Sequence, residues 1–465
     1  MKEKNILAEL DLLFHPRSVA ILGASGKEGK VGRLFMERFI ETGFQKLYPV
    51  NLRESEILGI KAYPTITDIP GPVDLALILT PPAAVIAAIK ECVSKGVKGI
   101  IITTAGFGER GEKGKELEGE IARIARDGGA RVVGPNCIGI YCPSSRLPFP
   151  MGPGRESGPV GVVSQSGSFA DHLTVAATTN GIRFSKAISC GNECDLNAID
   201  FLEYLGEDSE TRIIAAYLEG MKDGRQFYYL ARNISKKKPM IVWKCGTTEA
   251  GARAAASHTG ALAGSGPIWN GVLRQAGIIS VNSLEEMLDC LYALYFQPLP
   301  RGRKVGIITG PGGPAVGTTD ACLELGLEVP QFCKETKEKL LKVVPPVGTS
   351  VDNPVDMSIA AAVASDIYGD VIRILGQDEN IDMLLVIGSG GKQFDNAIME
   401  GMRELRKPLA VAIIIPLELV LQDFRLLQGS SVPVYTDPRR AANALSKLAD
   451  YVELREGVQY GDLEL

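Results

Sequence analysis

A histidine within a run of small residues is the feature of this sequence that most directly suggests chemistry. Residues 253–266 read Arg-Ala-Ala-Ala-Ser-His-Thr-Gly-Ala-Leu-Ala-Gly-Ser-Gly and contain His258, one of only three histidines in the chain. No bulky side chain flanks the imidazole, and the glycines allow the backbone to take positive φ angles or to move. We therefore expect residues 247–266 to form a mobile loop in which His258 can meet a partner group. The simpler interpretation is a solvated loop histidine.

A glycine-rich turn near the start of the chain has the composition of a phosphate-binding loop. Glycines let the backbone approach a pyrophosphate, and the N-terminus of the following helix carries a partial positive charge. Alone the signal is weak, because such turns bind NAD, FAD, CoA or nothing. Dinucleotide folds place an acid at the end of the second strand to hold the ribose, but here that place holds Asn51, followed by Arg53. Surroundings without an acid tolerate a ribose phosphate, which favours CoA or NADP. The residues assigned to this cofactor site are Gly23, Ser25, Gly26, Lys27, Asn51, Arg53, Thr80 and Pro81.

A second turn, residues 164–168, reads Ser-Gln-Ser-Gly-Ser and precedes a helical pattern. Serine hydroxyls and free N–H groups at the start of a helix suit a single phosphate. The alternative is plain capping of the helix by Ser166 or Ser168.

Glu219 ends the apolar run 213–218, which is typical of a buried strand. Strand ends line the ligand crevice of an open α/β sheet, so this carboxylate could hold one nitrogen of a working histidine. The alternative is an ordinary loop glutamate. The pairs Cys137/Cys142 and Cys190/Cys194 have no histidine at ligand spacing, so we predict no metal site.

The same device, a short apolar run followed by a Gly/Ser turn and a helical pattern, begins near residues 19, 160 and 305. Each copy is typical of the opening of a parallel α/β sheet. We therefore predict three consecutive parallel-sheet domains, Rossmann-like or flavodoxin-like, covering residues 1–142, 143–297 and 298–465. The expected strands are 18–22, 46–50, 75–79, 99–103 and 131–133 in the first domain, 160–163, 185–189, 213–218, 240–243 and 277–280 in the second, and 304–308, 383–387, 409–415 and 432–435 in the third, which ends on a helix at 438–451.

Composition narrows the class of protein. A net charge of −5 argues against a nucleic-acid-binding protein, although it leaves room for small anionic ligands. Nine cysteines without CxxC spacing indicate reduced thiols and a cytoplasmic protein. The longest apolar run, 408–421, is interrupted by Pro416 and Glu418, so we expect no membrane span.

Together these motifs resemble the α subunit of nucleoside-diphosphate-forming acyl-CoA synthetases, relatives of succinyl-CoA synthetase, and most of all the ADP-forming acetyl-CoA type. The resemblance covers essentially the whole chain. It rests on segments 13–25, 134–139, 164–167, 257–260 and 432–441, of which the third and fourth together are highly specific. The Gly-Pro-Gly-Gly turn at 310–313 departs from the usual Asn/Gly-rich form of this turn in the family.

The resemblance implies a role for each part of the chain. The first domain binds CoA or acetyl-CoA, with Asn136 and Cys137 near the thioester. The second carries a phosphohistidine at His258, supported by Glu219, and the third is a ligase-CoA type domain. The implied phosphate-binding residues are Gln165, Ser166, Gly167, Ser168, Ser257, Thr259 and Gly260.

The implied reaction converts acyl-CoA, phosphate and ADP into free acid, CoA and ATP through an acyl phosphate. No length remains for the ATP-grasp module, so the resemblance implies a separate β subunit, in an α2β2 heterotetramer, that would supply the nucleotide site with its Mg²⁺. Two alternatives stay open. One is an NADP-dependent oxidoreductase, and the other is a non-enzymatic CoA-binding scaffold or sensor.

Overall fold

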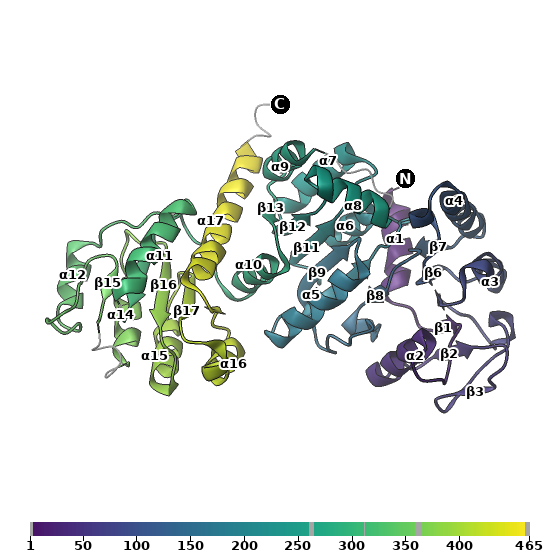
Figure 1. The fold of residues 1–465 in the computed structure, drawn as a ribbon, viewed down its shortest axis with the longest axis horizontal. Helices are drawn as coiled ribbons and strands as arrows, with labels where there is room; N and C mark the ends of the chain where they lie inside the picture. The colour runs from purple at the N-terminus through teal and green to yellow at the C-terminus, as the bar shows by residue number, and fades with distance from the viewer. Residues whose placement is uncertain (1–2, 260–264, 311, 359–364, 461–465) are drawn as a thin grey trace. The chain divides into compact units, whose positions relative to one another are not determined.

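The computed structural model describes residues 3–259, 265–310, 312–358 and 365–460. It forms two compact units, residues 1–282 and 283–465. The described residues contain three sheets of five or six strands, flanked by helices, and one small two-stranded sheet (Figure 1). The first unit contains two of these sheets and the second unit contains the third.

The first sheet has five parallel strands, and helices cover both of its faces. Successive side chains of a strand point to opposite faces, so each strand contributes to two cores. Ala20 and Ile78 pack with residues of α3 and α4, whereas Ile21 and Leu77 pack with residues of α1 and α2. In spatial order the strands are β2 (Leu47–Val50), β1 (Val19–Leu22), β5 (Leu75–Ile78), β6 (Gly99–Ile102) and β7 (Arg131–Val133). The flanking elements are α1 (Glu3–Phe14), α2 (Val31–Thr42), β3 (Glu56–Ile57), β4 (Ile60–Lys61), η1 (Ile66–Asp68), α3 (Pro82–Lys95), η2 (Gly108–Arg110) and α4 (Glu112–Asp127).

The second sheet has five parallel strands and one antiparallel edge strand. In spatial order they are β13 (Ile279–Val281), β12 (Met240–Lys244), β11 (Ile213–Leu218), β9 (Ser157–Ser164), β10 (Phe184–Ser189) and the antiparallel β8 (Gly139–Tyr141). The helices are η3 (Pro143–Ser145), α5 (Gly167–Thr179), α6 (Ala198–Glu207), α7 (Gly224–Ser235), α8 (Glu249–Thr259) and α9 (Gly266–Gln275).

The third sheet, in the second unit, is again five-stranded and parallel. In spatial order its strands are β15 (Val355–Asp356), β14 (Val305–Thr309), β16 (Met383–Gly388), β17 (Leu409–Ile413) and β18 (Val434–Tyr435). The helices are α10 (Leu284–Phe296), α11 (Gly312–Glu324), α12 (Lys334–Leu340), α14 (Ile367–Gly376), α15 (Lys392–Met402), η4 (Leu417–Leu419), α16 (Leu421–Gly429) and α17 (Pro438–Tyr460).

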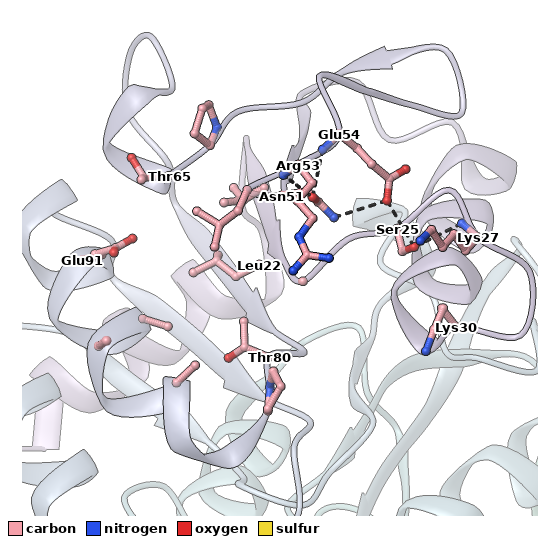
Figure 2. Close-up of a pocket in the computed structure, with 18 residues that line it drawn as sticks. Leu22, Ser25, Lys27, Lys30, Asn51, Arg53, Glu54, Thr65, Thr80 and Glu91 are labelled. Atoms are coloured by element: carbon pink, nitrogen blue, oxygen red, sulfur yellow. Dashed lines mark hydrogen bonds between the residues drawn. The ribbon is translucent and has the colours of Figure 1, made fainter.

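All three sheets share one topology. Counting only the parallel strands, the second strand of each sheet lies at one edge beside the first, and the first lies beside the third. The chain therefore reverses direction across each sheet between its first and third strands. In open α/β sheets, ligands bind at the carboxyl ends of the strands at this switch point. For the first sheet the switch point lies between β1 and β5, where Figure 2 looks into a pocket.

The predicted α/β class with three sheets is confirmed, and some elements differ from the prediction or cross a predicted boundary. β8 precedes the predicted boundary at 142 but joins the second sheet, which is therefore mixed. α10 precedes the predicted boundary at 297 but belongs to the second compact unit. The last helix extends beyond 451, to Tyr460. The prediction of a loop at 247–266 was wrong for its first half, because α8 covers Glu249–Thr259. Alanine is the strongest helix former, and it outweighed the glycine and serine there.

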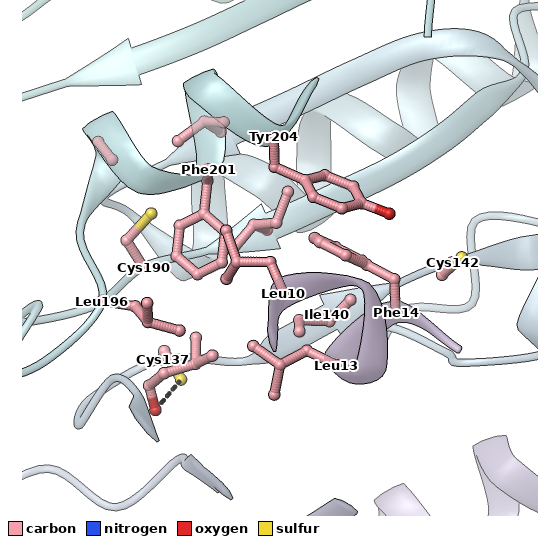
Figure 3. Packing of buried hydrophobic residues seen from close by; sticks show 14 of the residues in the cluster. Leu10, Leu13, Phe14, Cys137, Ile140, Cys142, Cys190, Leu196, Phe201 and Tyr204 are labelled. Carbon is pink, nitrogen blue, oxygen red and sulfur yellow. Dashed lines mark hydrogen bonds between the residues drawn. The ribbon is translucent and has the colours of Figure 1, made fainter. Parts of the chain in front are cut away.

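The two sheets of the first unit share a hydrophobic core. α1 packs against α6, where the rings of Phe14 and Tyr204 stack with centroids 4.6 Å apart (Figure 3). The Tyr204 hydroxyl donates a hydrogen bond of 2.8 Å to Asp11. Leu10 and Leu13 of α1 belong to the same buried cluster. The N-terminal helix therefore joins the first sheet to a helix of the second.

A buried carboxylate also joins the two sheets. Asp195, in the loop after β10, accepts hydrogen bonds from Arg126 Nε at 2.6 Å and from Arg131 Nε at 3.0 Å. It also accepts the backbone N–H of Val132 at 2.9 Å. Its side chain is fully buried, whereas that of Arg126 is 56% exposed.

The helices and cysteines of the described residues can be compared with the predictions for membrane spans and thiols. None of their helices combines the length and the apolar character needed to cross a membrane. All nine cysteines fall within the described ranges, and each is a free thiol.

We expect Asp195→Asn to lower the free energy of unfolding of the first unit by about 2–3 kcal/mol, because it removes the buried charge that pairs with Arg126 and Arg131 and leaves Arg131 with Glu9 alone. The expected loss of unfolding free energy is smaller than for a fully buried ion pair, because solvent screens the exposed Arg126 side chain. Urea unfolding measures the change. Asp127→Asn is the matched control, since the side chain of Asp127 is 71% exposed and lies 3.7 Å from Arg123. Equal effects of the two substitutions would contradict the role of Asp195.

Candidate functional site

A pocket of about 650 Å³ lies at the switch point of the first sheet (Figure 2). The loops that follow β1, β2 and β5 form its walls, because the carboxyl ends of these neighbouring strands share one edge. The predicted cofactor residues that line it are Gly23, Ser25, Lys27, Asn51, Arg53, Thr80 and Pro81. The other three predicted residues do not line the pocket. Gly26 lies between two lining residues, Ser25 and Lys27, whereas Asn136 and Cys137 follow β7.

Glycine is required where the first turn meets α2. A Cβ atom on Gly32 would lie 2.2 Å from the carbonyl oxygen of Gly23, so only glycine allows the helix to start this close to the turn. Gly23 itself has a φ of +90°, which L side chains rarely adopt. Gly23 and Gly32 are therefore glycines because the start of α2 packs closely against the turn that follows β1.

The polar walls of the pocket supply positive charge and a free hydroxyl. Arg53 extends into the pocket in Figure 2, and no described residue forms a hydrogen bond or ion pair with its guanidinium. Lys27 and Lys30 also line the pocket. Thr80 has a buried hydroxyl with no hydrogen-bond partner among the described residues. These groups can bind an anionic ligand that also offers a hydrogen-bonding atom.

Asn51 and Glu54 organise the loop after β2. The Asn51 amide accepts the backbone N–H groups of Arg53 and Glu54 at 2.8 and 3.0 Å and donates to the carbonyl of Ala24 at 2.8 Å. Asn51 therefore shapes the pocket wall. Glu54 was missed in the sequence analysis, and its carboxylate accepts the N–H of Gly26 at 3.1 Å. Asn51 follows β2 as predicted, but the loop also folds the carboxylate of Glu54 back onto the turn, so an acid lies beside the pocket.

The switch point of the second sheet brings together the turn at 164–168 and Glu219. Gln165, after β9, accepts the backbone N–H groups of Glu219 and Gly220 through Oε1, at 2.6 and 3.0 Å. Its Nε2 donates to the carbonyl oxygen of Gly220 at 2.9 Å. The amide of Gln165 thus binds backbone, and its side chain is buried.

Ser166 is the N-cap of α5, which agrees with the alternative prediction of helix capping. Its hydroxyl accepts the N–H of Phe169 at 3.3 Å and lies 3.3 Å from the hydroxyl of Ser168. Gly167 lies close to Ile138 and Ser189, and a Cβ atom there would approach both within 3.2 Å. The helix start is therefore packed closely against neighbouring strands, with its serine hydroxyls together.

Glu219 is held from a second side by Lys244, which the sequence analysis also missed. Lys244, the last residue of β12, donates to the carbonyl oxygen of Glu219 at 2.8 Å, and burial lowers its pKa. Burial raises the pKa of the Tyr217 hydroxyl, and the neighbouring Cys245 and Glu219 add to the increase. The Glu219 backbone is therefore fixed by side chains from both neighbouring strands. Lys244 could have been found as a charged residue at the end of an apolar strand.

His258 lies on α8, which begins just after the carboxyl end of β12 and packs beside η2. Strands β9, β11 and β12 run parallel and in register, so the turn after β9, Glu219 and the start of α8 follow the same edge. The side chains of Ser257, His258 and Thr259, together with Gly260, lie outside the described residues. The predicted contact between Glu219 and the imidazole therefore remains a prediction.

Asn136 and Cys137 lie between the two sheets of the first unit. Asn136 has a φ of +58° and donates to Asn192 Oδ1 at 3.2 Å. Asn192 in turn donates to the carboxylates of Glu109 and Glu118 at 2.6 and 2.7 Å. Cys137 is buried, and burial raises its pKa to about 12. Its thiol is therefore neutral, while Asn136 is held by a polar network that contains Glu109 of η2.

The described residues contain no group of three or more His, Cys, Asp or Glu side chains arranged to hold a metal ion.

Family models for three kinds of domain match the chain. A CoA-binding domain matches residues 17–143, a succinyl-CoA ligase-like flavodoxin domain matches 157–294, and a ligase-CoA domain matches 305–391. Each match contains one of the three sheets or a large part of it.

Similar proteins span the whole chain. The acetate–CoA ligase [ADP-forming] II subunit alpha of Pyrococcus furiosus is 40% identical, with 94% of this chain and 96% of that protein covered. The acetate–CoA ligase [ADP-forming] I of Archaeoglobus fulgidus is 36% identical over 96% of this chain, which spans only 64% of that longer relative. The dinucleotide-forming acetyl-coenzyme A synthetase 1 of Ca. Korarchaeum cryptofilum, solved in complex with phosphate and ADP, has a TM-score of 0.89 and 33% identity, covering 97% of this chain and 98% of that chain. This chain belongs to the family of alpha subunits of ADP-forming acetate–CoA ligases.

Proposed function

We propose that this chain binds the acyl-CoA and phosphate substrates of an ADP-forming acyl-CoA synthetase and transfers the phosphoryl group through His258. The observation that carries the proposal is the meeting of the turn after β9 with Glu219 at one switch point, within a chain of this family. Acetyl-CoA is the proposed substrate, because the relatives are named for acetate.

The pocket of the first sheet is the proposed CoA site. Arg53 would pair with the ribose 3′-phosphate, and the turn at 23–27 would face the pyrophosphate. Glu54 must release the N–H of Gly26 for this turn to bind a phosphate oxygen, since one N–H cannot serve both acceptors well. Asn136, held by Asn192, is proposed to lie towards the thioester end of the ligand.

The proposed chemistry has three steps. Phosphate attacks the thioester carbonyl, the C–S bond breaks, and an acyl phosphate and the CoA thiol result. An imidazole nitrogen of His258 then attacks phosphorus, so that the acyl P–O bond breaks and the free acid leaves. Finally the P–N bond breaks as an oxygen of ADP takes the phosphoryl group. The N-terminus of α5 and Ser166 and Ser168 would offset the charge of the phosphoryl oxygens.

A β subunit is the proposed partner. The name of the Pyrococcus relative implies such a subunit for that protein, and the Archaeoglobus relative has additional length beyond the part matched here. We propose that the partner carries the ADP site in an ATP-grasp module, with Mg²⁺ bound there, in an α2β2 assembly. The division of this chain at residues 142 and 297 into CoA-binding, phosphohistidine and ligase-CoA domains is part of the same proposal.

His258→Asn should abolish ATP formation from acetyl-CoA, phosphate and ADP while CoA binding is retained, because the substitution removes only the nucleophile. The assay uses the complex with the β subunit, and labelled phosphate measures the acid-labile phosphoenzyme. A non-enzymatic scaffold would form no such phosphate in the unmodified protein. Acid-labile label persisting in the variant would move the site to His172 or to the partner.

Arg53→Gln should weaken binding of CoA by about 1.5–3 kcal/mol, the range for a hydrogen bond to a charged group, and leave dephospho-CoA unaffected. Calorimetry on the two ligands measures the difference. Arg123→Gln, which changes a 67% exposed side chain on α4, is the control for altered net charge. The proposed placement fails if CoA and dephospho-CoA bind the unmodified protein equally.

Glu219→Gln should slow formation of the phosphoenzyme more than it weakens CoA binding, because a neutral amide stabilises the imidazole less than a carboxylate does. Quenched-flow labelling gives the rate, and calorimetry gives the affinity. A variant that loses only CoA affinity would show that Glu219 serves the other site.

A further inference from the structure

The carboxylate of Glu54 lies on the turn that the proposed function assigns to a phosphate (Figure 2). One of its oxygens, Oε2, accepts the backbone N–H of Gly26 at 3.1 Å. The other, Oε1, lies 3.5 Å from the hydroxyl of Ser25 and 3.4 Å from Nδ2 of Asn51. A backbone N–H and a hydroxyl in a glycine-rich turn are groups that bind a phosphate oxygen. Glu54 therefore contacts the turn in the way that an anionic ligand would.

The hydrogen bond between Glu54 and Gly26 is of the same kind that a phosphate would form. A carboxylate only accepts hydrogen bonds, and an N–H group binds an ionised acceptor more strongly than a neutral one. Basic side chains line the same pocket, yet no described residue forms an ion pair with the Glu54 carboxylate. The contacts of this carboxylate are thus made with the turn and with Asn51, while the cations of the pocket face the space for a ligand.

The local geometry allows Glu54 to reach the turn and to leave it. A Cβ atom on Gly26 would lie 3.0 Å from Glu54 Oε2, so the glycine leaves room for the carboxylate beside its N–H group. Asn51 Oδ1 accepts the backbone N–H of Glu54 at 3.0 Å and anchors that part of the loop. Rotation of the Glu54 side chain alone is therefore enough to uncover the N–H of Gly26. Such rotations are fast compared with the binding of a ligand.

We propose that Glu54 is a specificity-determining residue that competes with the pyrophosphate of CoA for the N–H group of Gly26. The inference deepens the proposed function and rests on it, since CoA is the ligand assigned to this pocket. The apparent affinity for CoA is lowered by the fraction of molecules in which Glu54 occupies the turn. A ligand with a pyrophosphate replaces the lost hydrogen bond, whereas a ligand with a neutral group at this position does not. Glu54 thus selects for ligands that bring an anion to the turn.

Glu54→Gln tests the competition with little change in shape. The amide oxygen of the new side chain can still accept the N–H of Gly26, but the charge that strengthens this hydrogen bond is removed. Glu56→Gln is the matched control. Glu56 lies two residues further on, in β3, where its side chain is exposed and it pairs with Lys61 of β4. Both variants change the net charge equally, so a difference between them measures the contact with the turn.

Calorimetry with CoA measures the affinity of the two variants. Glu54→Gln should bind CoA about tenfold more tightly than Glu56→Gln, because a neutral side chain competes less well for the N–H group. Equal affinities would overturn the proposal. Weaker binding by Glu54→Gln would also overturn it, because the carboxylate would then stabilise the bound ligand.

Stopped-flow kinetics distinguish competition from simple repulsion between Glu54 and the bound ligand. Competition reduces the fraction of molecules that can accept CoA, so its removal should increase the association rate about tenfold and leave the dissociation rate nearly unchanged. A gain in affinity that appears only in the dissociation rate would overturn the proposal.

Amide hydrogen exchange on the protein without added ligand tests whether Glu54 holds the turn in solution. The amide of Gly26 should exchange about tenfold faster in Glu54→Gln than in Glu56→Gln, the effect of weakening one charge-assisted hydrogen bond. The amide of Gly23, which donates to the carbonyl oxygen of Val50 at 3.1 Å, is the internal reference and should be unchanged. Equal exchange of Gly26 in the two variants would overturn the proposal.

Exchange in the presence of CoA separates the failure of this inference from the failure of the proposed function. In Glu54→Gln, saturating CoA should protect the amide of Gly26, because a phosphate oxygen then accepts its hydrogen bond. If CoA leaves Gly26 unprotected there, the proposed CoA site fails and the competition fails with it. If CoA protects Gly26 but binds Glu54→Gln no more tightly than Glu56→Gln, the CoA site stands and the role of Glu54 is overturned.

Discussion

The order of the strands constrains where chemistry can occur in this protein. In each sheet the first parallel strand lies between the second and the third, so the loops that follow these strands meet at one edge. In the first sheet these loops surround a pocket, and in the second sheet they place Gln165 next to Glu219. Helices cover the faces of the first sheet, and its strands are buried there. Polar groups can therefore converge only at the strand ends.

Hydrogen bonds to the backbone then fix the residues at these ends. Asn51 shapes the wall of the first pocket, and Gln165 with Lys244 fixes Glu219 from two sides. In both places an amide side chain satisfies main-chain groups that would otherwise be left unpaired near a buried edge. These amides bind the backbone of the charged residues themselves, Arg53 in the first site and Glu219 in the second. Preorganisation of this kind reduces the rearrangement that polar groups must undergo when a charged ligand binds.

Much of this arrangement could be predicted from the sequence. The apolar runs and the Gly/Ser turns indicated the parallel strands, and the position of Glu219 at a strand end predicted that it would lie along the ligand-binding edge of the sheet. The antiparallel strand β8 could not be predicted, because its three residues form a strand only through pairing with β10. Glu54 and Lys244 were missed for a related reason. Their partners are distant in sequence or lie in irregular loops, so their roles depend on how those loops fold. The helix α8 was missed because glycine and serine were given more weight than the alanines between them.

The core shared by α1, α6 and the two sheets of the first unit makes residues 1–282 one cooperative folding unit. Phe14 and Tyr204 stack across the junction, and Asp195 binds Arg131 and Val132 of β7. A fragment that ends near residue 142 would expose the apolar face of α1 and lack Asp195, the carboxylate that pairs with both Arg126 and Arg131. The chain passes from the first sheet to the second near residue 142, but the two sheets do not fold independently of each other. Heating should melt both sheets in a single transition, and a loss of packing in one sheet lowers the stability of the pocket in the other.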